Sequence, residues 1–298
     1  MIDLLLLPFN YDFFNRGLLM SILVGGICGL IGVYIVVRGL SYMGHGLSHS
    51  IFGGAMMSLS SGFNYYVGGI VWGIFSSILI NEISRKKKIK PDAAIGLVTT
   101  ASFALGIILI SNSTNYFRNI ESFLFGNILA ISNEDLFVLS VVSCISLIFF
   151  FVYYKRLLFT FFDSESAKIF GVNVRLTEIL FTIILSLVII SSMTSIGVTL
   201  LAAVLIGPAL TARLLTNQFN RLVVLSSIIG ICCCFSGMYL SFYLDYPSGP
   251  TIVILIAFAF LLSQLVSYVN KLNHIHSHGA HKHSHPHTHT NDHRHEHK

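Results

Sequence analysis

Long runs without charged residues dominate the chain, and short polar segments separate them. A helix needs about 20 apolar residues to cross a bilayer. The pattern predicts about nine such spans, two of them within the stretch 39–81, two within 179–212, and one each in 17–37, 93–117, 136–154, 222–244 and 246–270. Continuous apolar runs favour helices over a strand barrel, in which polar and apolar residues would alternate. We therefore expect an all-α polytopic membrane protein with about eight or nine transmembrane helices.

Two segments make this count approximate. Residues 39–62 and 120–133 also fit half-helices or re-entrant segments. In the stretch 179–212 we expect a break near Thr194–Gly197. We expect two domains by composition, a transmembrane domain over 1–271 and a separate tail over 272–298.

Composition excludes an ordinary soluble enzyme. The chain is 54% hydrophobic and only 10% charged, with a mean hydropathy of +0.77. Soluble domains carry roughly 25% charged residues, which they need to cover a water-facing surface. The five cysteines lie within apolar stretches and are expected to pack as small hydrophobic residues. The N-terminal segment has no early lysine or arginine, so we expect no secretory signal peptide.

The net charge of +5 fits a membrane protein better than a nucleic-acid binder, because the basic residues lie mainly in short loops. Loops rich in lysine and arginine face the cytoplasm. Placing Arg85–Lys90, Lys155–Arg156 and the pair Arg213 and Arg221 on the cytoplasmic side is consistent with nine spans. The N-terminus is then expected outside and the C-terminal tail inside.

Two histidines, His45 and His49, stand four positions apart in an uncharged stretch. On a helix their Cβ atoms would lie on one face, about 5–6 Å apart, so both imidazoles could bind one metal ion. Ionisable side chains in membrane segments usually face a bundle interior or a water-filled path. The alternative is that either histidine only donates a hydrogen bond to a neighbouring helix. Zinc prefers four ligands, and two copies of the chain on a two-fold axis would supply four nitrogens.

The tail is the second candidate for metal chemistry. Neutral imidazole is a common ligand for zinc, copper and nickel. Its histidines are His274, His276, His278, His281, His283, His285, His287, His289, His293, His295 and His297. We expect a segment that is disordered without metal and that catches or senses metal ions. The alternative is a low-complexity extension without a function.

A polar segment between two predicted spans is expected to form a short cytoplasmic helix. Asp163 or Ser164 suits the N-cap, Glu165 suits the first turn, and Gly171 suits the end. Such a helix is either an ordinary loop helix or a lever that docks on a cytoplasmic motor. The sequence has no GxxxxGK[ST], HExxH or GxSxG motif, so we expect no enzymatic activity and no ATP hydrolysis by the phosphate-loop route.

Several ordered segments resemble the motifs of one family, the ABC-type permeases for zinc, manganese and iron(II) uptake. The resemblance runs from about residue 14 to 268. The segments are Arg38–Gly54, Pro91–Gly96, Leu124–Leu136, Asp163–Val172, Gly197–Arg213 and Pro247–Val253. Several motifs in the same order are far more specific than any one of them.

The resemblance implies a multi-pass permease in the bacterial cytoplasmic membrane, paired with a second permease subunit, with a homodimer expected. It implies a separate cytoplasmic ATPase, docked at a coupling segment that here contains Asp163, Ser164, Glu165, Ala167 and Gly171. It also implies an extracytoplasmic metal-binding protein that delivers the ion. We expect no permanently bound cofactor, and we expect transport to proceed by alternating access.

The family's intramembrane metal site uses an aspartate and a histidine, and the matching positions here are His45 and His49. The chain departs from the family at His45, where the aspartate is replaced. Imidazole in place of a carboxylate weakens manganese binding and favours zinc. We therefore expect Zn²⁺ as the transported ion. The alternatives are a manganese or iron(II) permease, an ATP-independent histidine-rich carrier, and a membrane sensor of metal.

Overall fold

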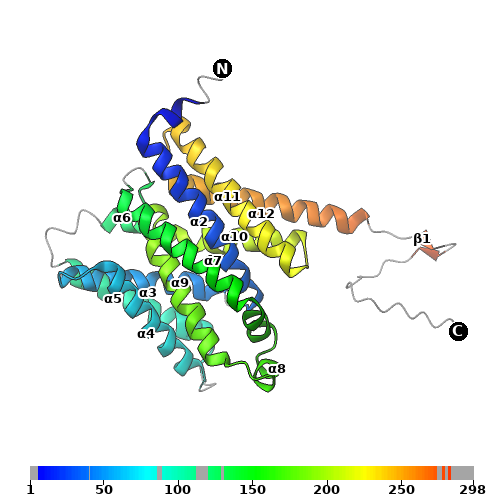
Figure 1. The fold of residues 1–298 in the computed structure, drawn as a ribbon. Helices are drawn as coiled ribbons and strands as arrows, with labels where there is room; N and C mark the ends of the chain where they lie inside the picture. Colours follow the sequence, from blue (N-terminus) through cyan, green and yellow to red (C-terminus); the bar gives the residue numbers. More distant parts are fainter. Residues whose placement is uncertain are drawn as a thin grey trace.

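The computed structural model describes residues 6–39, 41–85, 89–111, 120–128, 131–273, 277–278 and 281–282, and this part of the chain is almost entirely helical. It begins with a short 3-10 helix, η1 (Leu7–Asn10). The α-helices are α2 (Asp12–Val37), α3 (Ser41–Ser60), α4 (Tyr65–Arg85), α5 (Pro91–Ser111), α6 (Ile120–Phe125), α7 (Asn133–Phe162), α8 (Ser164–Ile169), α9 (Val174–Ile196), α10 (Val198–Leu215), α11 (Phe219–Leu244) and α12 (Ser248–Asn273). Figure 1 shows them as one bundle, from which α12 extends to one side.

Nine of the described helices have 18 residues or more: α2, α3, α4, α5, α7, α9, α10, α11 and α12. Seven of these are both long and apolar enough to cross a membrane. The other two are α3 and α4, and the apolar stretch found in α4, Tyr65–Ile80, is shorter. The structure thus confirms an all-α membrane protein, and the predicted count of eight or nine spans agrees approximately with its long helices.

The two segments that also fitted half-helices or re-entrant segments, residues 39–62 and 120–133, differ in the structure. Residues Ser41–Ser60 form a continuous helix of 20 residues, so the first is no half-helix. In the second, the described residues form only the six-residue α6 before α7 begins at Asn133. The expected break near Thr194–Gly197 is confirmed. Gly197 has a φ of +87°, a backbone conformation that side chains with a Cβ rarely adopt, and it separates α9 from α10.

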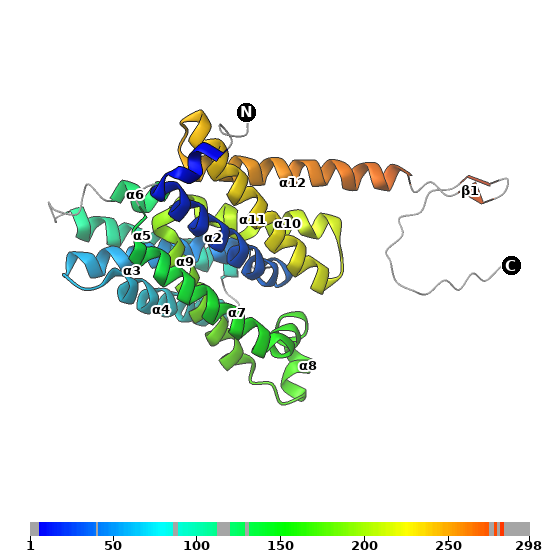
Figure 2. The same ribbon diagram turned by 45° about the horizontal axis from the view of Figure 1, so that its top comes forward.

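Contacts between helix ends show that the successive long helices α7, α9 and α10 alternate in direction, and that α2 runs parallel to α7 and α10. At one end of the bundle, Arg38 after α2 pairs with Glu178 near the start of α9, and Arg213 near the end of α10 donates to the carbonyl of Val36 at 3.1 Å. At the other end, Arg16 near the start of α2 contacts Asn133 at the start of α7. The first end carries the basic loops that the charge rule places in the cytoplasm, and α8 lies there in Figures 1 and 2.

Small residues let α2 pack at the centre of the bundle. A Cβ on Gly25 would lie 2.4 Å from the carbonyl oxygen of Gly230 on α11, and one on Gly32 only 1.8 Å from that of Leu205 on α10. The Ser226 hydroxyl donates to the carbonyl of Gly29 at 2.6 Å. Close backbone approach through small residues is how helices associate within a bilayer, where lipid is as apolar as the side chains.

The tail lies mostly outside the described residues. Helix α12 continues to Asn273, two residues beyond the predicted end of the transmembrane domain. Beyond it, Ser277–His278 and His281–Lys282 form two strands of two residues each, β1 and β2, paired antiparallel. These four residues qualify the all-α prediction. The expectation that the tail is disordered lies otherwise outside the described residues.

Candidate functional site

The two intramembrane histidines lie together on α3. The ring centroids of His45 and His49 are 4.7 Å apart, and the ring planes are nearly perpendicular, at 87°. Both side chains are half-buried. The i, i+4 spacing therefore places two imidazoles side by side on one helix face, as the sequence predicted.

Helix α3 is held by close backbone contacts on two sides. A Cβ on Gly53 would lie 2.2 Å from the carbonyl oxygen of Ser102 on α5. Gly106 on α5 packs against Gly53 from the same side. A Cβ added to Gly54 would lie 2.7 Å from the carbonyl oxygen of Gly68 on α4. With glycine at these positions, three helices pack backbone to backbone. The histidines thus stand on a densely packed element.

Aromatic rings line the same region. The ring of Phe103 on α5 meets the His49 ring at a right angle, with 5.1 Å between centroids. Phe103 in turn stacks on Phe52 at 5.0 Å. On the other side, the exposed Tyr42 has its ring 6.2 Å from that of His45. Tyr42, His45 and His49 have the i, i+3, i+7 spacing of one helix face.

Phe103 was not predicted from the sequence. It lies 54 positions after His49, in an apolar run that contains no other signal. Only the packing of α5 on α3 brings it to the histidine.

One chain supplies only two strong ligands here. Among the described side chains, no three or more histidine, cysteine, aspartate or glutamate residues come together in a way that could hold a metal ion. A site of two imidazoles holds an ion incompletely, since zinc prefers four ligands. The geometry is therefore suited either to a transient binding step or to a site completed by a second subunit.

The predicted short helix between two spans is present as α8. Asp163 is its N-cap, and its carboxylate accepts hydrogen bonds from the backbone N–H groups of Glu165 at 3.1 Å and Ser166 at 3.0 Å. The hydroxyl of Ser166 donates to the same carboxylate, and these bonds lower the pKa of Asp163 below its usual value. Gly171 ends the segment with a φ of +77°. The carboxylate that begins α8 is thus stabilised in its charged form.

The surface of α8 combines one buried anchor with an exposed apolar end. Ala167 is fully buried, whereas Ser164 and Glu165 are exposed. Ile169 and Phe170 are 83% and 75% exposed, although both are large and apolar. They lie at the end of the bundle that the charge rule places in the cytoplasm, where exposed apolar side chains mark a contact surface. Neither was among the individual coupling residues predicted from the sequence, although both lie within the segment Asp163–Val172 that resembles the family's motif.

Of the tail histidines, only His278 and His281 lie within the described residues, where their backbones pair in the ladder β1–β2. The other nine, His274, His276, His283, His285, His287, His289, His293, His295 and His297, lie outside them. The metal-binding role expected for the tail stays a prediction.

Comparison with known proteins agrees with this architecture. Residues 10–267 match the family described as the ABC 3 transport family. The chain is 35% identical over 271 residues to the manganese transport system membrane protein MntC of Listeria monocytogenes, covering 88% of this chain and 95% of that protein. It is 35% identical over 268 residues to a probable iron transport system membrane protein of Haemophilus influenzae, covering 90% and 94%.

Solved structures show the same fold. The structure described as PsaBC from Streptococcus pneumoniae in complex with Fab superimposes with a TM-score of 0.84 at 33% identity, covering 92% of this chain and all of that one. An inward-facing putative metal-chelate type ABC transporter matches with a TM-score of 0.66 at 19% identity, over 84% and 85% of the two chains. The second similarity concerns the fold alone.

Proposed function

Because this chain belongs to the ABC 3 transport family, and is thus a permease subunit of an importer for divalent metal ions, we propose that the ion it passes is Zn²⁺. The permease is a multi-pass protein of the bacterial cytoplasmic membrane. The single observation that carries the choice of ion is the pair of imidazoles 4.7 Å apart on α3.

The donor set of this pair supports zinc. Imidazole nitrogen binds zinc well, whereas manganese favours carboxylate, carbonyl and water oxygens. Two permease subunits on a two-fold axis would bring His45 and His49 of each chain to one ion, giving four nitrogens. Without carboxylates among its ligands, such a site has no negative charge of its own, which weakens its hold on a divalent ion and aids release.

Manganese or iron(II) is the second candidate, and the names of the relatives favour it. The relatives compared above are named for manganese and iron transport. Imidazole also binds iron(II), so iron fits the histidine pair better than manganese does. Direct competition between the three ions distinguishes these candidates.

The proposed mechanism is alternating access driven by a partner ATPase. An extracytoplasmic binding protein delivers the ion, and His45 and His49 hold it in passage. The ATPase docks on α8, where Ala167 anchors the helix and Ile169 and Phe170 are exposed for contact. ATP-driven movement of α8 then opens the cytoplasmic side of the pathway.

The tail is proposed to act as a metal-catching arm on the cytoplasmic side. Its histidines follow α12 in the chain, and the distribution of lysine and arginine in the loops predicts that this end of the chain lies inside the cell. An ATP-independent carrier with such a tail would transport metal without any partner, and this distinguishes it from the proposed importer.

The testing experiment is uptake of radiolabelled zinc in cells that lack other zinc importers, with and without the ATPase. Three chains are compared: the natural sequence, H45A/H49A, and a chain ending at Asn273. The proposal expects ATPase-dependent zinc uptake that the double substitution abolishes and that the truncation lowers only when zinc is scarce. Uptake that persists without the ATPase would indicate the independent carrier. If the permease takes up manganese or iron(II) and excess zinc does not inhibit this uptake, then that metal, and not zinc, is the transported ion.

A further inference from the structure

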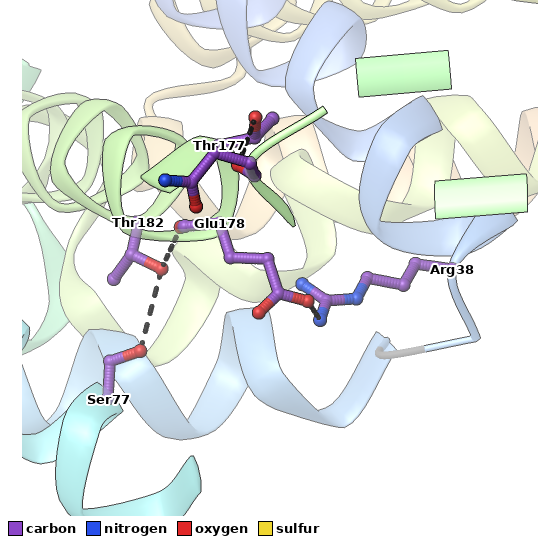
Figure 3. A network of polar contacts seen from close by, with 6 residues as sticks. Arg38, Ser77, Thr177, Glu178 and Thr182 are labelled. Atoms are coloured by element: carbon purple, nitrogen blue, oxygen red, sulfur yellow. Dashed lines mark hydrogen bonds and ion pairs between the residues drawn. The ribbon is translucent and has the colours of Figure 1, made fainter. Parts of the chain in front are cut away.

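One guanidinium contacts both helices that flank α8. Arg38, which follows the last residue of α2, donates a hydrogen bond to the carboxylate of Glu178 on α9 (Figure 3). Its Cζ also lies 4.9 Å from the ring centroid of Phe161 on α7. Phe161 stands two positions before the α8 cap, and Glu178 lies on the second turn of α9. Arg38 therefore contacts the chain just before and just after the short helix.

The Glu178 side of this contact belongs to an ordered part of α9. The side chain of Asn173 caps the helix by accepting a hydrogen bond from the backbone of Leu176 at 3.1 Å. The carbonyl of Glu178 accepts a bond from the Thr182 hydroxyl at 2.9 Å, and the Ser77 hydroxyl on α4 reaches Thr182 at 3.5 Å (Figure 3). A movement of α8 that shifts the start of α9 would therefore carry the Glu178 carboxylate with it.

The path from Arg38 to the metal helix is short. Helix α3 begins at Ser41, and His45 stands seven positions after Arg38. Gly39 has a φ of +71°, a left-handed conformation of the kind that ends helices, and it follows the arginine directly. Only two residues separate Arg38 from the first residue of the helix that carries the histidine pair, so the arginine and the start of α3 are close along the chain.

The ion pair between Arg38 and Glu178 is suited to transmit a movement of α9 to the end of α2. The side chains of Arg38 and Glu178 are only 24% and 22% exposed, so solvent screens their interaction only in part. Removing one partner would leave a partly desolvated charge unpaired. Lysine would not replace the arginine fully, because its ammonium lacks the planar fork that contacts a carboxylate and an aromatic ring together.

We propose that Arg38 is a positioning residue that transmits the movement of α8 to α3, and so sets the orientation of His45 and His49 during transport. This inference rests on the proposed function, in which an ATPase moves α8 and the histidines hold the ion. Arg38 itself does not touch the metal. Its loss should leave the metal site intact and disconnect it from ATP hydrolysis.

The test uses vesicles that contain the permease, its ATPase and its binding protein, and measures zinc delivered per ATP hydrolysed. R38Q and E178Q are each expected to lower this ratio about tenfold, with ATP hydrolysis within about twofold of the natural protein. The double variant R38Q/E178Q should lose little more than either single change, because both remove the same contact. The swap R38E/E178R should recover part of the ratio.

Two controls keep the inference separate from a merely structural role. R156Q removes an arginine from the same end of the bundle, where its guanidinium lies 5.4 Å from the ring of Tyr153 on its own helix, and should leave the ratio unchanged. Equilibrium dialysis on chains that end at Asn273, so that the tail histidines contribute no binding, should find normal zinc binding in R38Q. An unchanged ratio in R38Q and E178Q would overturn the inference. The inference would also be overturned if melting temperature, ATP hydrolysis and zinc uptake all fell together in R38Q and E178Q and the swap R38E/E178R did not restore them.

The same dialysis distinguishes this inference from the proposed function. If H45A/H49A still binds zinc normally, the proposed ligands are wrong, whatever Arg38 does. If H45A/H49A loses zinc and R38Q transports at the natural ratio, the ligands stand and the link through Arg38 is wrong.

Discussion

The ring of Phe103 on α5 meets the ring of His49 on α3 edge to face, with 5.1 Å between centroids and 90° between the planes. Phe103 is held in turn by stacking on Phe52. The orientation of one proposed metal ligand is thus fixed by a second helix. Aromatic contacts of this kind contribute about 0.5–1.5 kcal/mol beyond the burial of area.

Replacing Phe103 by leucine should loosen the His49 ring and weaken zinc binding. We expect the KM for zinc uptake to rise about 2- to 10-fold with little change in maximal rate, as the loss of 0.5–1.5 kcal/mol implies. The measurement is zinc uptake into reconstituted vesicles over a range of zinc concentrations, which gives the KM and the maximal rate of each variant separately. Phe151→Leu is the matched control, because that ring is 87% exposed on α7. Equal effects of both substitutions would show that the contact with His49 has no special role.

Restoring a carboxylate next to His49 should shift the choice of ion. His45→Asp exchanges an imidazole for a hard oxygen donor and adds one negative charge per chain, which favours manganese. We expect manganese to compete with zinc about tenfold more effectively in this variant, a difference of about 1.4 kcal/mol. Competition uptake at fixed zinc and increasing manganese measures it. An unaltered preference would mean that His45 does not contact the ion.

The contact between α3 and α5 depends on glycine. In Gly53→Ala the new methyl group would lie 2.2 Å from the backbone oxygen of Ser102, so the two helices must separate. We expect a loss of about 1–3 kcal/mol of stability, seen as a lower melting temperature in detergent.

The matched control for this change is Gly96→Ala. Its Cβ would stand 3.5 Å from the Tyr42 hydroxyl, an ordinary contact, and alanine favours helix over glycine by about 1 kcal/mol. It should therefore melt at or above the temperature of the natural protein. A stable Gly53→Ala protein would contradict the close packing of α3 on α5.

The exposed apolar end of α8 should be needed for assembly with the ATPase. Phe170→Asp places a charge on a side chain that is 75% exposed and that we expect to be covered in the complex. Co-purification of the ATPase should fall about tenfold, while the permease keeps its melting temperature. Asn217→Ala, on the connection between α10 and α11 at the same end of the bundle, should have no effect. Undiminished assembly of Phe170→Asp would place the ATPase contact elsewhere.

Features encoded over a few neighbouring residues could be predicted from the sequence. The histidine pair follows from an i, i+4 spacing, and α8 follows from a capping aspartate and a terminal glycine. The break before Val198 follows from a glycine within a long apolar run. In each case the residues that form the feature are adjacent in the chain, so the physical cause is visible in the sequence.

Features formed between helices could not be predicted in this way. Arg38 and Glu178 are 140 positions apart, and each on its own fits a solvated charge at the end of a span. Phe103 is one of 24 phenylalanines, and nothing local distinguishes it from those that face lipid. The choice depends on which face of α5 packs on α3, and that is decided by glycines on both helices.

The most direct test of the central claim is zinc binding by the purified permease, with the tail removed after Asn273 so that only the intramembrane site remains. We predict that the tail-free protein binds about one zinc ion per two chains and that H45A/H49A binds none, since zinc prefers four ligands and each chain supplies two. Undiminished zinc binding by the double variant would contradict the account, because the ion would then be held by residues other than His45 and His49.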